Sequence, residues 1–258
     1  MDVANSVKPN LVNDEAVIGM MVFELATPGI PYVLARAGLD FAIYDMESTS
    51  VSWETLRTLS LGSHAAGIMP IVRLPSIWPD TVGRALDLGL MGIMAPKVES
   101  AEEALALVSY AKFPPDGKRG SGHGLLSGAP QGMDPSAYMR TVNDAVMLLC
   151  QIETPRGVEH ADAIAAVEGI DVLSIGVNDL SSALGAPGDF ENPQFTEAVE
   201  HVRERTTAHG KWFGGGVREA ENIPNALATG QRFMWTRPDT AMLISSVKQY
   251  VDLLPGER

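Results

Sequence analysis

The sequence has little cysteine and no long apolar run, and both absences limit what the protein can be. Cys150 is the only cysteine in 258 residues, so no disulfide can form within the chain. It lies in an apolar run, which is typical of a small buried residue rather than of a reactive thiol. No run approaches the roughly 20 apolar residues of a membrane span, and the first ten residues lack the basic and apolar regions of a signal peptide. We therefore expect a cytoplasmic protein without a membrane partner.

Basic residues are also scarce. The chain has 19 Lys and Arg against 32 Asp and Glu, which gives a net charge of -13 at pH 7. A surface of this sign repels phosphate backbones, so a nucleic-acid partner is not expected. A local anion site is still compatible with it, because two arginines in one cleft outweigh a distant acidic surface. The pairs Glu159-His160 and Glu200-His201 lack the spacing of metal ligands.

Against these absences stand eight apolar runs with strand character and a helical pattern after each. Most of the runs are continuous rather than alternating, as in strands buried on both faces of a parallel sheet. The runs are residues 16–23, 41–44, 69–74, 92–98, 146–152, 172–177, 212–217 and 232–236. The helical patterns are residues 28–37, 53–65, 78–88, 101–111, 155–167, 193–209, 219–228 and 240–254.

Eight βα units at this length predict a TIM barrel, with residues 1–258 as one domain. A doubly wound open sheet is the alternative. That fold would require a glycine-rich phosphate turn after the first strand, and residues 24–27, Glu-Leu-Ala-Thr, do not form one. One connection is unusually long: residues 113–124 are rich in glycine and proline, and the sequence stays polar to residue 144. Loops of this length in compact domains are often functional.

Two carboxylates follow neighbouring predicted strands within residues 146–180. Glu153 comes after the first apolar run and Asp179 after the second, with one helical segment between the runs. A right-handed crossover between parallel strands places both carboxyl-terminal ends at the same edge. Carboxylate oxygens are preferred ligands of hard divalent cations. The two residues therefore predict a site for Mg²⁺ or Mn²⁺ at the mouth of the barrel.

Other polar side chains are expected at the same mouth. They are Asp45 and Glu47 after the second strand, Arg73 at the end of the third, Lys97, Gln151, Asn178, Arg237 and Asp239. Arg73 suits bidentate binding of a carboxylate, although a structural ion pair explains it equally well. Taken singly, Asp45 and Asp179 fit helix or turn caps, and Glu153 fits a helix-dipole partner. Lys97 is expected to pair with Glu99 or Asp87. Only the convergence of these residues favours an active site.

Eight short segments at ordered spacing resemble the HpcH/HpaI-type class II pyruvate-dependent aldolases. They are AGLDF at 37–41, YDME at 44–47, VRLP at 72–75, LDLG at 86–89, APKVESAEEA at 95–104, PPDGKRG at 114–120, QIET at 151–154 and IGVNDLS at 175–181. The resemblance covers nearly the whole chain. It implies a TIM barrel that assembles as a homohexamer, a trimer of dimers, with the last helix exchanged between paired subunits.

The resemblance also implies the chemistry of the site. A divalent metal, Mg²⁺ or Mn²⁺ and alternatively Co²⁺ or Zn²⁺, would bind Glu153 and Asp179. A 2-oxo acid such as pyruvate would chelate that metal beside Asp179, with an aldehyde as the second small-molecule partner. Arg73 and Gln151 would contact the substrate oxygens, and Arg73 would stabilise the enolate. The implied reaction is cleavage or formation of a 4-hydroxy-2-oxo acid.

The sequence departs from the family pattern at one catalytic position. The pattern after the second strand is Asp-x-Glu-His, with the histidine as base and the aspartate as its support, but here Ser48 follows Asp45-Met46-Glu47. A serine hydroxyl does not accept protons near neutral pH. Three explanations remain open: His123 of the glycine-rich loop supplies the base, a water held by Ser48 and Asp45 relays the proton, or the reaction is not aldol cleavage. The alternatives are a 2-oxo acid decarboxylase, a condensing synthase and a binding protein with impaired catalysis.

Overall fold

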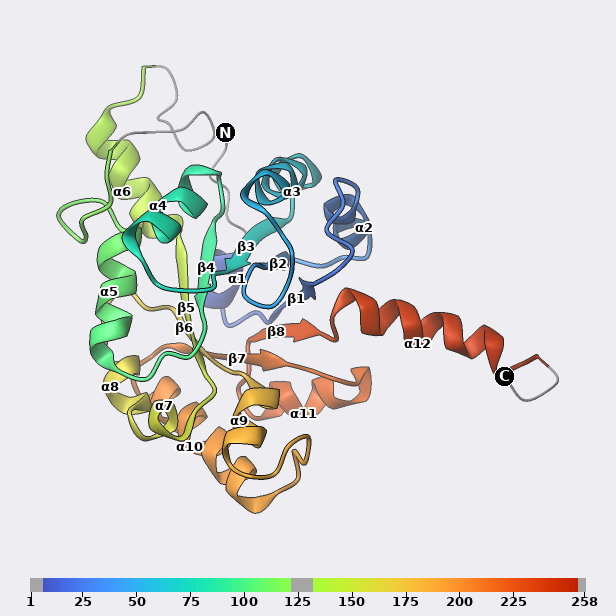
Figure 1. Cartoon of the computed structure of the whole chain (residues 1–258). Helices are drawn as coiled ribbons and strands as arrows, with labels where there is room; N and C mark the ends of the chain where they lie inside the picture. Colours follow the sequence, from blue (N-terminus) through green and yellow to red (C-terminus); the bar gives the residue numbers. More distant parts are fainter. Residues whose placement is uncertain (1–6, 122–131, 255–258) are drawn as a thin grey trace.

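Eight parallel strands form a closed barrel in the order β1 to β8 (Figure 1), which confirms the predicted TIM barrel. The computed structural model describes residues 7–121 and 132–254. The strands are β1 Val17–Val22, β2 Phe41–Asp45, β3 Met69–Arg73, β4 Gly92–Ala95, β5 Met147–Ile152, β6 Val172–Ile175, β7 Trp212–Gly216 and β8 Phe233–Thr236. Each lies inside a predicted run or within one residue of it. Strands β2 to β6 are buried throughout, and β1, β7 and β8 are buried except for one or two positions each.

Helices surround the barrel as predicted, with three differences. The helical segments are α1 Val7–Val12, α2 Ile30–Arg36, α3 Trp53–Ala66, α4 Pro79–Asp87, α5 Ala101–Ala111, α6 Pro135–Ala145, α7 Pro155–Glu159, α8 Ala161–Ala165, α9 Val177–Ala183, α10 Pro193–Ala208, η1 Ala220–Asn222, α11 Ile223–Ala228 and α12 Asp239–Val251. No helix was predicted in the polar segment that runs to residue 144, but α6 occupies its end. The predicted helix 155–167 is two short helices that meet at His160. The predicted strand 172–177 ends at Ile175, and α9 follows at once.

Side chains fill the barrel interior below the mouth. The rings of Phe41 and Phe233 stack at 4.3 Å between centroids, and Ile71, Met94 and Leu149 belong to the same buried cluster. Gly19 is required beside this stack, because a Cβ at residue 19 would lie 2.3 Å from the Phe41 ring. The interior is therefore a packed core rather than a channel. A cavity lies above this core, at the carboxyl-terminal ends of the strands.

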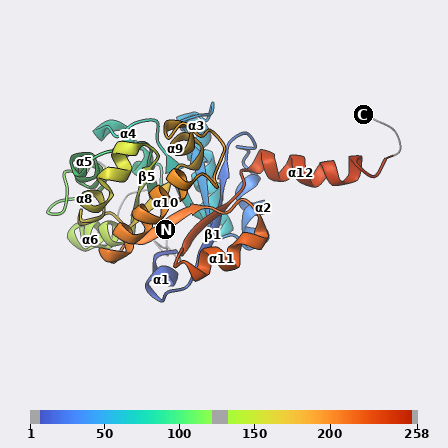
Figure 2. The ribbon, with the colours of Figure 1, turned by 90° about the horizontal axis from the view of Figure 1, so that it is seen from below.

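A buried carboxylate joins the last helix to the first strand. Asp239, the first residue of α12, accepts hydrogen bonds from the amides of Phe23, Glu24 and Leu25 at 3.1, 3.1 and 2.7 Å. These amides follow the end of β1 and have no sheet partner beyond it, so the carboxylate satisfies three donors at once. From this anchor α12 extends away from the barrel (Figures 1 and 2).

The outer half of α12 carries apolar side chains without cover. Ile244 is 66% exposed and Tyr250 is 75% exposed, and Leu243 and Val247 on the same helix are each 51% exposed. Apolar surface of this extent along one helix is typical of an interface. None of the helices in residues 7–121 and 132–254 combines the length and apolar character needed to cross a membrane.

The long connection before α6 is anchored where it is described. Arg119 is 6% exposed, donates to Asp87 at 2.8 Å, and lies over the Phe113 ring at 4.5 Å. The Asn143 side chain accepts from the amide of Phe113 and donates to its carbonyl, which ties α6 to the start of the connection. These contacts indicate that residues 113–121 have a structural role. His123, predicted as a possible base, lies outside the described residues.

Candidate active site

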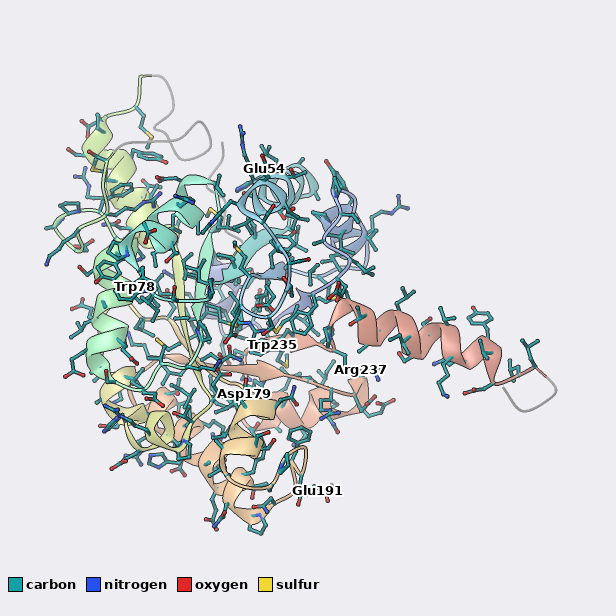
Figure 3. The ribbon with its side chains drawn as sticks, in the orientation of Figure 1. Glu54, Trp78, Asp179, Glu191, Trp235 and Arg237 are labelled. Carbon is teal, nitrogen blue, oxygen red and sulfur yellow. The ribbon has the colours of Figure 1, made fainter. Side chains whose placement is uncertain are left out.

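A cavity of about 450 Å³ opens at the carboxyl-terminal mouth of the barrel. Seven of the residues predicted at the mouth contribute to its lining, namely Ser48, Arg73, Gln151, Glu153, Asn178, Asp179 and Arg237. They lie at or after the ends of β2, β3, β5, β6 and β8, so the convergence expected from parallel strand ends is present. Asp45 is fully buried and lies beneath the lining rather than in it. Figure 3 shows Asp179, Trp235 and Arg237 around this mouth, while Glu54 and Glu191 lie at the periphery.

Asp45 holds the arginine of the next strand. In the register of β2 and β3, Asp45 stands beside Arg73, and its Oδ1 accepts from Arg73 Nε at 2.7 Å. The amides of Glu47 and Ser48 donate to the two carboxylate oxygens at 3.0 and 3.1 Å. Three donors therefore engage Asp45, and it fixes both the guanidinium and the turn that carries Ser48. The structural ion pair that the sequence left open for Arg73 is present.

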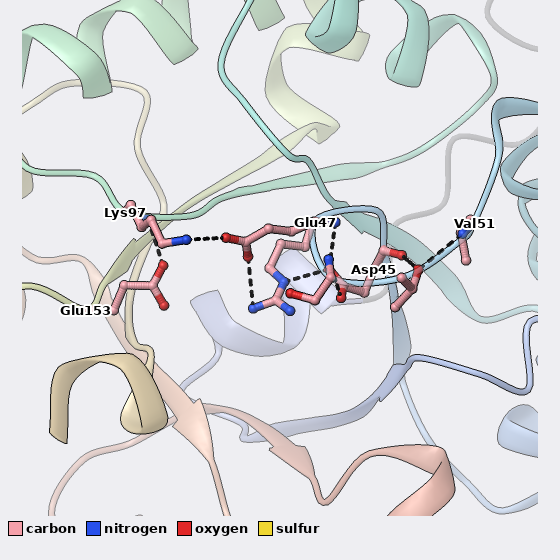
Figure 4. Close-up of polar contacts among 8 residues, drawn as sticks. Asp45, Glu47, Val51, Lys97 and Glu153 are labelled. Carbon is pink, nitrogen blue, oxygen red and sulfur yellow. Dashed lines mark hydrogen bonds and ion pairs between the residues drawn. The ribbon is translucent and has the colours of Figure 1, made fainter. Parts of the chain in front are cut away.

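Glu47 bridges two cations across the mouth (Figure 4). One of its carboxylate oxygens lies 3.2 Å from Arg73 Nη1, and the other accepts from Lys97 Nζ at 2.9 Å. Burial lowers the pKa of the Arg73 guanidinium, but the charges of Asp45 and Glu47 outweigh this and raise it. Lys97 was expected to pair with Glu99 or Asp87, and that expectation is wrong. The partner of Lys97 is Glu47, which follows β2, two strands away from β4, and is close in space rather than in sequence.

Glu153 is a buried carboxylate with one oxygen free. It is 1% exposed, and its Oε1 accepts from the backbone amide of Lys97 at 2.9 Å. Among the described residues its Oε2 has no hydrogen-bond partner, and neither has Oε1 of Gln151 beside it. Thr154, not Glu153, caps the following helix by accepting from the Gly157 amide at 3.1 Å. A buried acceptor without a donor points to a group that the chain itself does not supply.

Burial and like charges together raise the pKa of Glu153 to about 7. Desolvation is the larger cause, and the negative charges of Glu47 and Asp179 add to it. The contribution of Asp179 to this pKa indicates that the two predicted metal ligands are close enough to repel each other. Asp179 itself is exposed and lies in the first turn of α9, directly after β6. A cation between the two would favour the ionised form of Glu153 and so offset the burial and the repulsion that raise its pKa.

Gly176 keeps open the space in front of Glu153. A Cβ at residue 176 would lie 2.0 Å from Glu153 Oε2 and 2.9 Å from Gln151 Nε2. Any side chain at this position would therefore displace the free carboxylate oxygen. The amide of Gly176 donates to the carbonyl of Ile152 at 3.0 Å, which continues the pairing of β5 and β6 up to the cavity floor.

The donor set fits a divalent cation with an incomplete protein shell. Arg73 and Lys97 form their ion pairs with Asp45 and Glu47, and among the described residues Glu153 and Asp179 have none. Within residues 7–121 and 132–254, no group of three or more His, Cys, Asp or Glu side chains is placed to hold a metal. Glu153 and Asp179 would therefore supply two protein ligands, and water and substrate would complete the shell, as is usual for Mg²⁺.

The free energy of unfolding of the metal-free protein should fall as the pH rises through this range. The Glu153 pKa is 4.5 ordinarily and about 7 in the folded chain. The contribution of Glu153 to the free energy of unfolding is fully present below about pH 4.5. It is lost as the pH rises through about 7, which lowers the free energy of unfolding by about 3 kcal/mol. Urea unfolding of wild type and of Glu153→Gln at pH 5 to 8 measures this. The difference in free energy of unfolding between the two proteins should depend on pH. A constant difference would contradict the claim that burial raises the Glu153 pKa.

Two arginines at the mouth were either not predicted from the sequence or were predicted without a role. Arg218 follows β7 and Arg237 follows β8, and both contribute to the cavity lining. Arg237 was noted at its strand end, whereas the only signal for Arg218 was its place directly after the glycine-rich run 214–216. The backbone amide of Lys97, which donates to Glu153, was not predicted as part of the site either.

Comparison with known proteins identifies the family. The HpcH/HpaI aldolase/citrate lyase family matches residues 20–245. The chain belongs to this family. A hydroxypyruvate/pyruvate aldolase of Delftia acidovorans is 35% identical over 242 residues, which cover 93% of this chain and 88% of that protein. A 5-keto-4-deoxy-D-glucarate aldolase of Shigella dysenteriae is 31% identical and covers 88% of both chains.

A solved member of the HpcH/HpaI aldolase/citrate lyase family has nearly the same backbone. The HpcH/HpaI aldolase of Desulfitobacterium hafniense superposes with a TM-score of 0.92 at 31% identity, over 98% of each chain. The likeness includes almost the whole described chain, so the barrel and its mouth are family features. The resemblance inferred from the eight sequence segments is therefore confirmed.

Proposed function

We propose that the protein is a divalent-metal-dependent carbon–carbon lyase that cleaves or forms 4-hydroxy-2-oxo acids. The observation that supports this most directly is the buried, unpartnered oxygen of Glu153 in one cavity with Asp179 and Arg73. Membership of the HpcH/HpaI aldolase/citrate lyase family and relatives named as aldolases support the same reaction class. Pyruvate release from 4-hydroxy-2-oxo acids, with and without a chelator, tests the proposal.

Glu153 and Asp179 would hold the metal, which we propose to be Mg²⁺ or Mn²⁺ because both ligands are hard oxygens. Once bound, a divalent cation supplies Lewis-acid polarisation of the substrate's 2-oxo group. Co²⁺ and Zn²⁺ also accept carboxylate ligands, so metal substitution should rank the four ions by activity. Glu153 must be ionised to bind any of them.

Arg73 and Gln151 orient the 2-oxo acid. Asp45 and Glu47 bind Arg73 at Nε and Nη1, and Nη2 has no bond to either. The guanidinium is therefore locked by its structural partners and still presents a donor edge to the cavity. Such a preorganised cation stabilises negative charge on a substrate oxygen without moving during the reaction. Gln151, which is 4% exposed, adds an amide to the same wall.

Proton transfer at C3 of the 2-oxo acid is the step for which the cavity lining supplies the fewest suitable side chains. Ser48 lines the cavity, and no histidine of the described residues does. A water relay through Asp45 would have to share that carboxylate with three donors already in place. This favours, as a second candidate, decarboxylation of a 2-oxo acid such as oxaloacetate, which requires the metal and Arg73 but no strong base. Hydrogen–deuterium exchange at C3 of pyruvate separates the two, since rapid exchange would count against the decarboxylase.

We further propose that the protein is a homo-oligomer, a hexamer by family resemblance, in the cytoplasm. The uncovered apolar side chains of α12 support an assembly in which a second copy packs on this helix. Placing two lysines there, as Ile244→Lys with Val247→Lys, should reduce the particle mass measured by light scattering. Gln249→Lys adds charge to an already polar position of α12 and is the control. An unchanged mass in the double variant would count against the interface.

A further inference from the structure

Trp235 places an aromatic ring and an N–H donor at the cavity, and neither has a role in the reaction proposed above. It is the third residue of β8, lines the cavity and is only 6% exposed. Among the described residues, no hydrogen bond engages its indole N–H. Buried tryptophans usually find an acceptor for this group. The free N–H therefore points to an acceptor that the chain itself does not supply.

The ring of Trp235 is held in a fixed place. It meets the Phe233 ring edge-to-face at 6.3 Å between centroids, and Phe233 in turn stacks on Phe41. The register partners of Trp235 are Gly19 on β1 and Gly216 on β7. A Cβ at residue 216 would lie 3.0 Å from the indole nitrogen. The absence of a side chain there leaves room for the ring, so the donor is in position before a ligand binds.

Trp235 lies across the barrel from the residues proposed to hold the 2-oxo acid. In the closed ring of eight strands, β8 is opposite β4, and β4 is flanked by β3 and β5. Arg73 ends β3, Gln151 belongs to β5, and Glu153 follows β5 directly. Figure 3 shows Trp235 and Asp179 around the same mouth. A 2-oxo acid on Arg73 and Glu153 would therefore turn its unbound part toward Trp235.

The neighbours of Trp235 on this wall are poor partners for a neutral oxygen. Met21 of β1 and Phe23, which follows that strand, line the cavity with apolar side chains. The hydroxyl of Thr236 already donates to the carbonyl of Arg237 at 2.9 Å. The Arg237 side chain starts two residues beyond Trp235, nearer the opening of the barrel. The indole N–H is a neutral donor, which suits a hydroxyl or an aldehyde oxygen.

We propose that the indole N–H of Trp235 binds the oxygen on C4 of the substrate. This atom is the hydroxyl oxygen of a 4-hydroxy-2-oxo acid and the carbonyl oxygen of the aldehyde, so the inference rests on the proposed function. In condensation, C3 of the enolate forms a bond to the aldehyde carbon, and an electron pair of the C=O bond moves to the oxygen. The N–H stabilises that charge as a hydrogen-bond donor. An indole does not give up its proton near neutral pH, so the proton that completes the hydroxyl comes from solvent.

The test removes the N–H and keeps the shape of the ring. Incorporation of β-(3-benzothienyl)alanine at residue 235 replaces the N–H by sulfur. We expect kcat/KM for glycolaldehyde in its condensation with pyruvate to fall about tenfold, since one hydrogen bond to a developing charge is lost. Trp235→Phe also lacks the N–H and should show at least the same loss. An unchanged kcat/KM in the sulfur analogue would overturn the proposal.

Two controls separate contact with the C4 oxygen from a structural role. Trp212 begins β7, at the end of the strand away from the cavity, and is absent from the cavity lining. The same sulfur analogue at residue 212 should keep the wild-type kinetics. Oxalate resembles the 2-oxo acid but has no C4 oxygen, so its affinity for the metal-loaded protein should be the same in wild type and in the Trp235 variants. A fall in oxalate affinity as large as the fall in kcat/KM would overturn the proposal, because Trp235 would then serve the 2-oxo acid.

Failure of the proposed reaction is distinguishable from failure of this contact. If no aldehyde reacts with pyruvate in the metal-loaded protein, the aldolase assignment fails. Calorimetry with 2,4-dihydroxybutanoate and 2-hydroxybutanoate then tests Trp235 independently of turnover, because the two acids differ only in the C4 hydroxyl and neither can be cleaved. Wild type should bind the dihydroxy acid about fivefold more tightly, and the sulfur analogue at residue 235 should bind both equally. Equal affinities in wild type, or a preference that survives in the analogue, would reject the contact.

Discussion

Replacing Glu153 with Gln should abolish metal binding and lower kcat by about a thousandfold or more. Glu153 is the buried member of the ligand pair and the only one whose free oxygen lacks a partner among the described residues. Asp179 alone is exposed and would hold a cation weakly. Asp179→Asn should therefore have a similar effect. Metal content by mass spectrometry and pyruvate release by a coupled assay measure both consequences.

The loss in Glu153→Gln should occur without loss of the fold. Glutamine has the same shape but no charge to bury, so the metal-free variant should unfold no more easily than metal-free wild type above pH 7. Glu168→Gln removes an exposed carboxylate that does not line the cavity and is the matched control. If Glu153→Gln and Asp179→Asn retained metal and full activity, the assignment of the metal site would be wrong.

Replacing Ser48 with His should raise the rate of C3 proton exchange of pyruvate by about a hundredfold. Ser48 is exposed at the cavity lining, so an imidazole has room there, and its backbone amide is held by Asp45 at 3.1 Å. The new side chain would supply a group that accepts a proton near pH 7, which serine does not. Exchange in D₂O followed by NMR measures the effect directly, without an aldehyde.

Ser48→Asn is the control for this gain, because asparagine is polar and of similar size but takes up no proton. Equal rates in the His and Asn variants would show that the base already lies elsewhere. His123→Gln would then be the variant to measure, since this loop histidine is the remaining candidate. A gain confined to Ser48→His would show that Arg73, the carboxylates and the metal are otherwise ready for aldol chemistry.

Strand positions were predictable because parallel strands inside a barrel are buried on both faces and read as continuous apolar runs. Segment ends were less predictable. The apolar run that ends at Val177 overlaps the first residue of α9, so nothing in the pattern indicates that Asp179 belongs to a helix. Helix α6 was missed because few of its positions are buried, chiefly Tyr138, Val142 and Asn143, and the rest of it reads as a polar loop.

The members of the site were predictable, but their partners were not. Parallel topology alone places Arg73, Glu153 and Asp179 at one mouth. The stagger between neighbouring strands decides which side chains touch, and no sequence pattern encodes it. That stagger sets Asp45 beside Arg73, so the aspartate expected to support a base supports the guanidinium instead. The contact between Glu47 and Lys97 likewise spans two strands.

The carboxylate of Asp239 gives the barrel mouth a mechanical link to the projecting helix. Asp239 begins α12 and also accepts from the amide of Phe23, whose ring lies 5.8 Å from the Arg73 guanidinium. If the proposed assembly packs a second copy on α12, these two contacts connect that interface with Arg73. Dilution that separates the copies would then alter the catalytic constant itself and not only the stability of the protein.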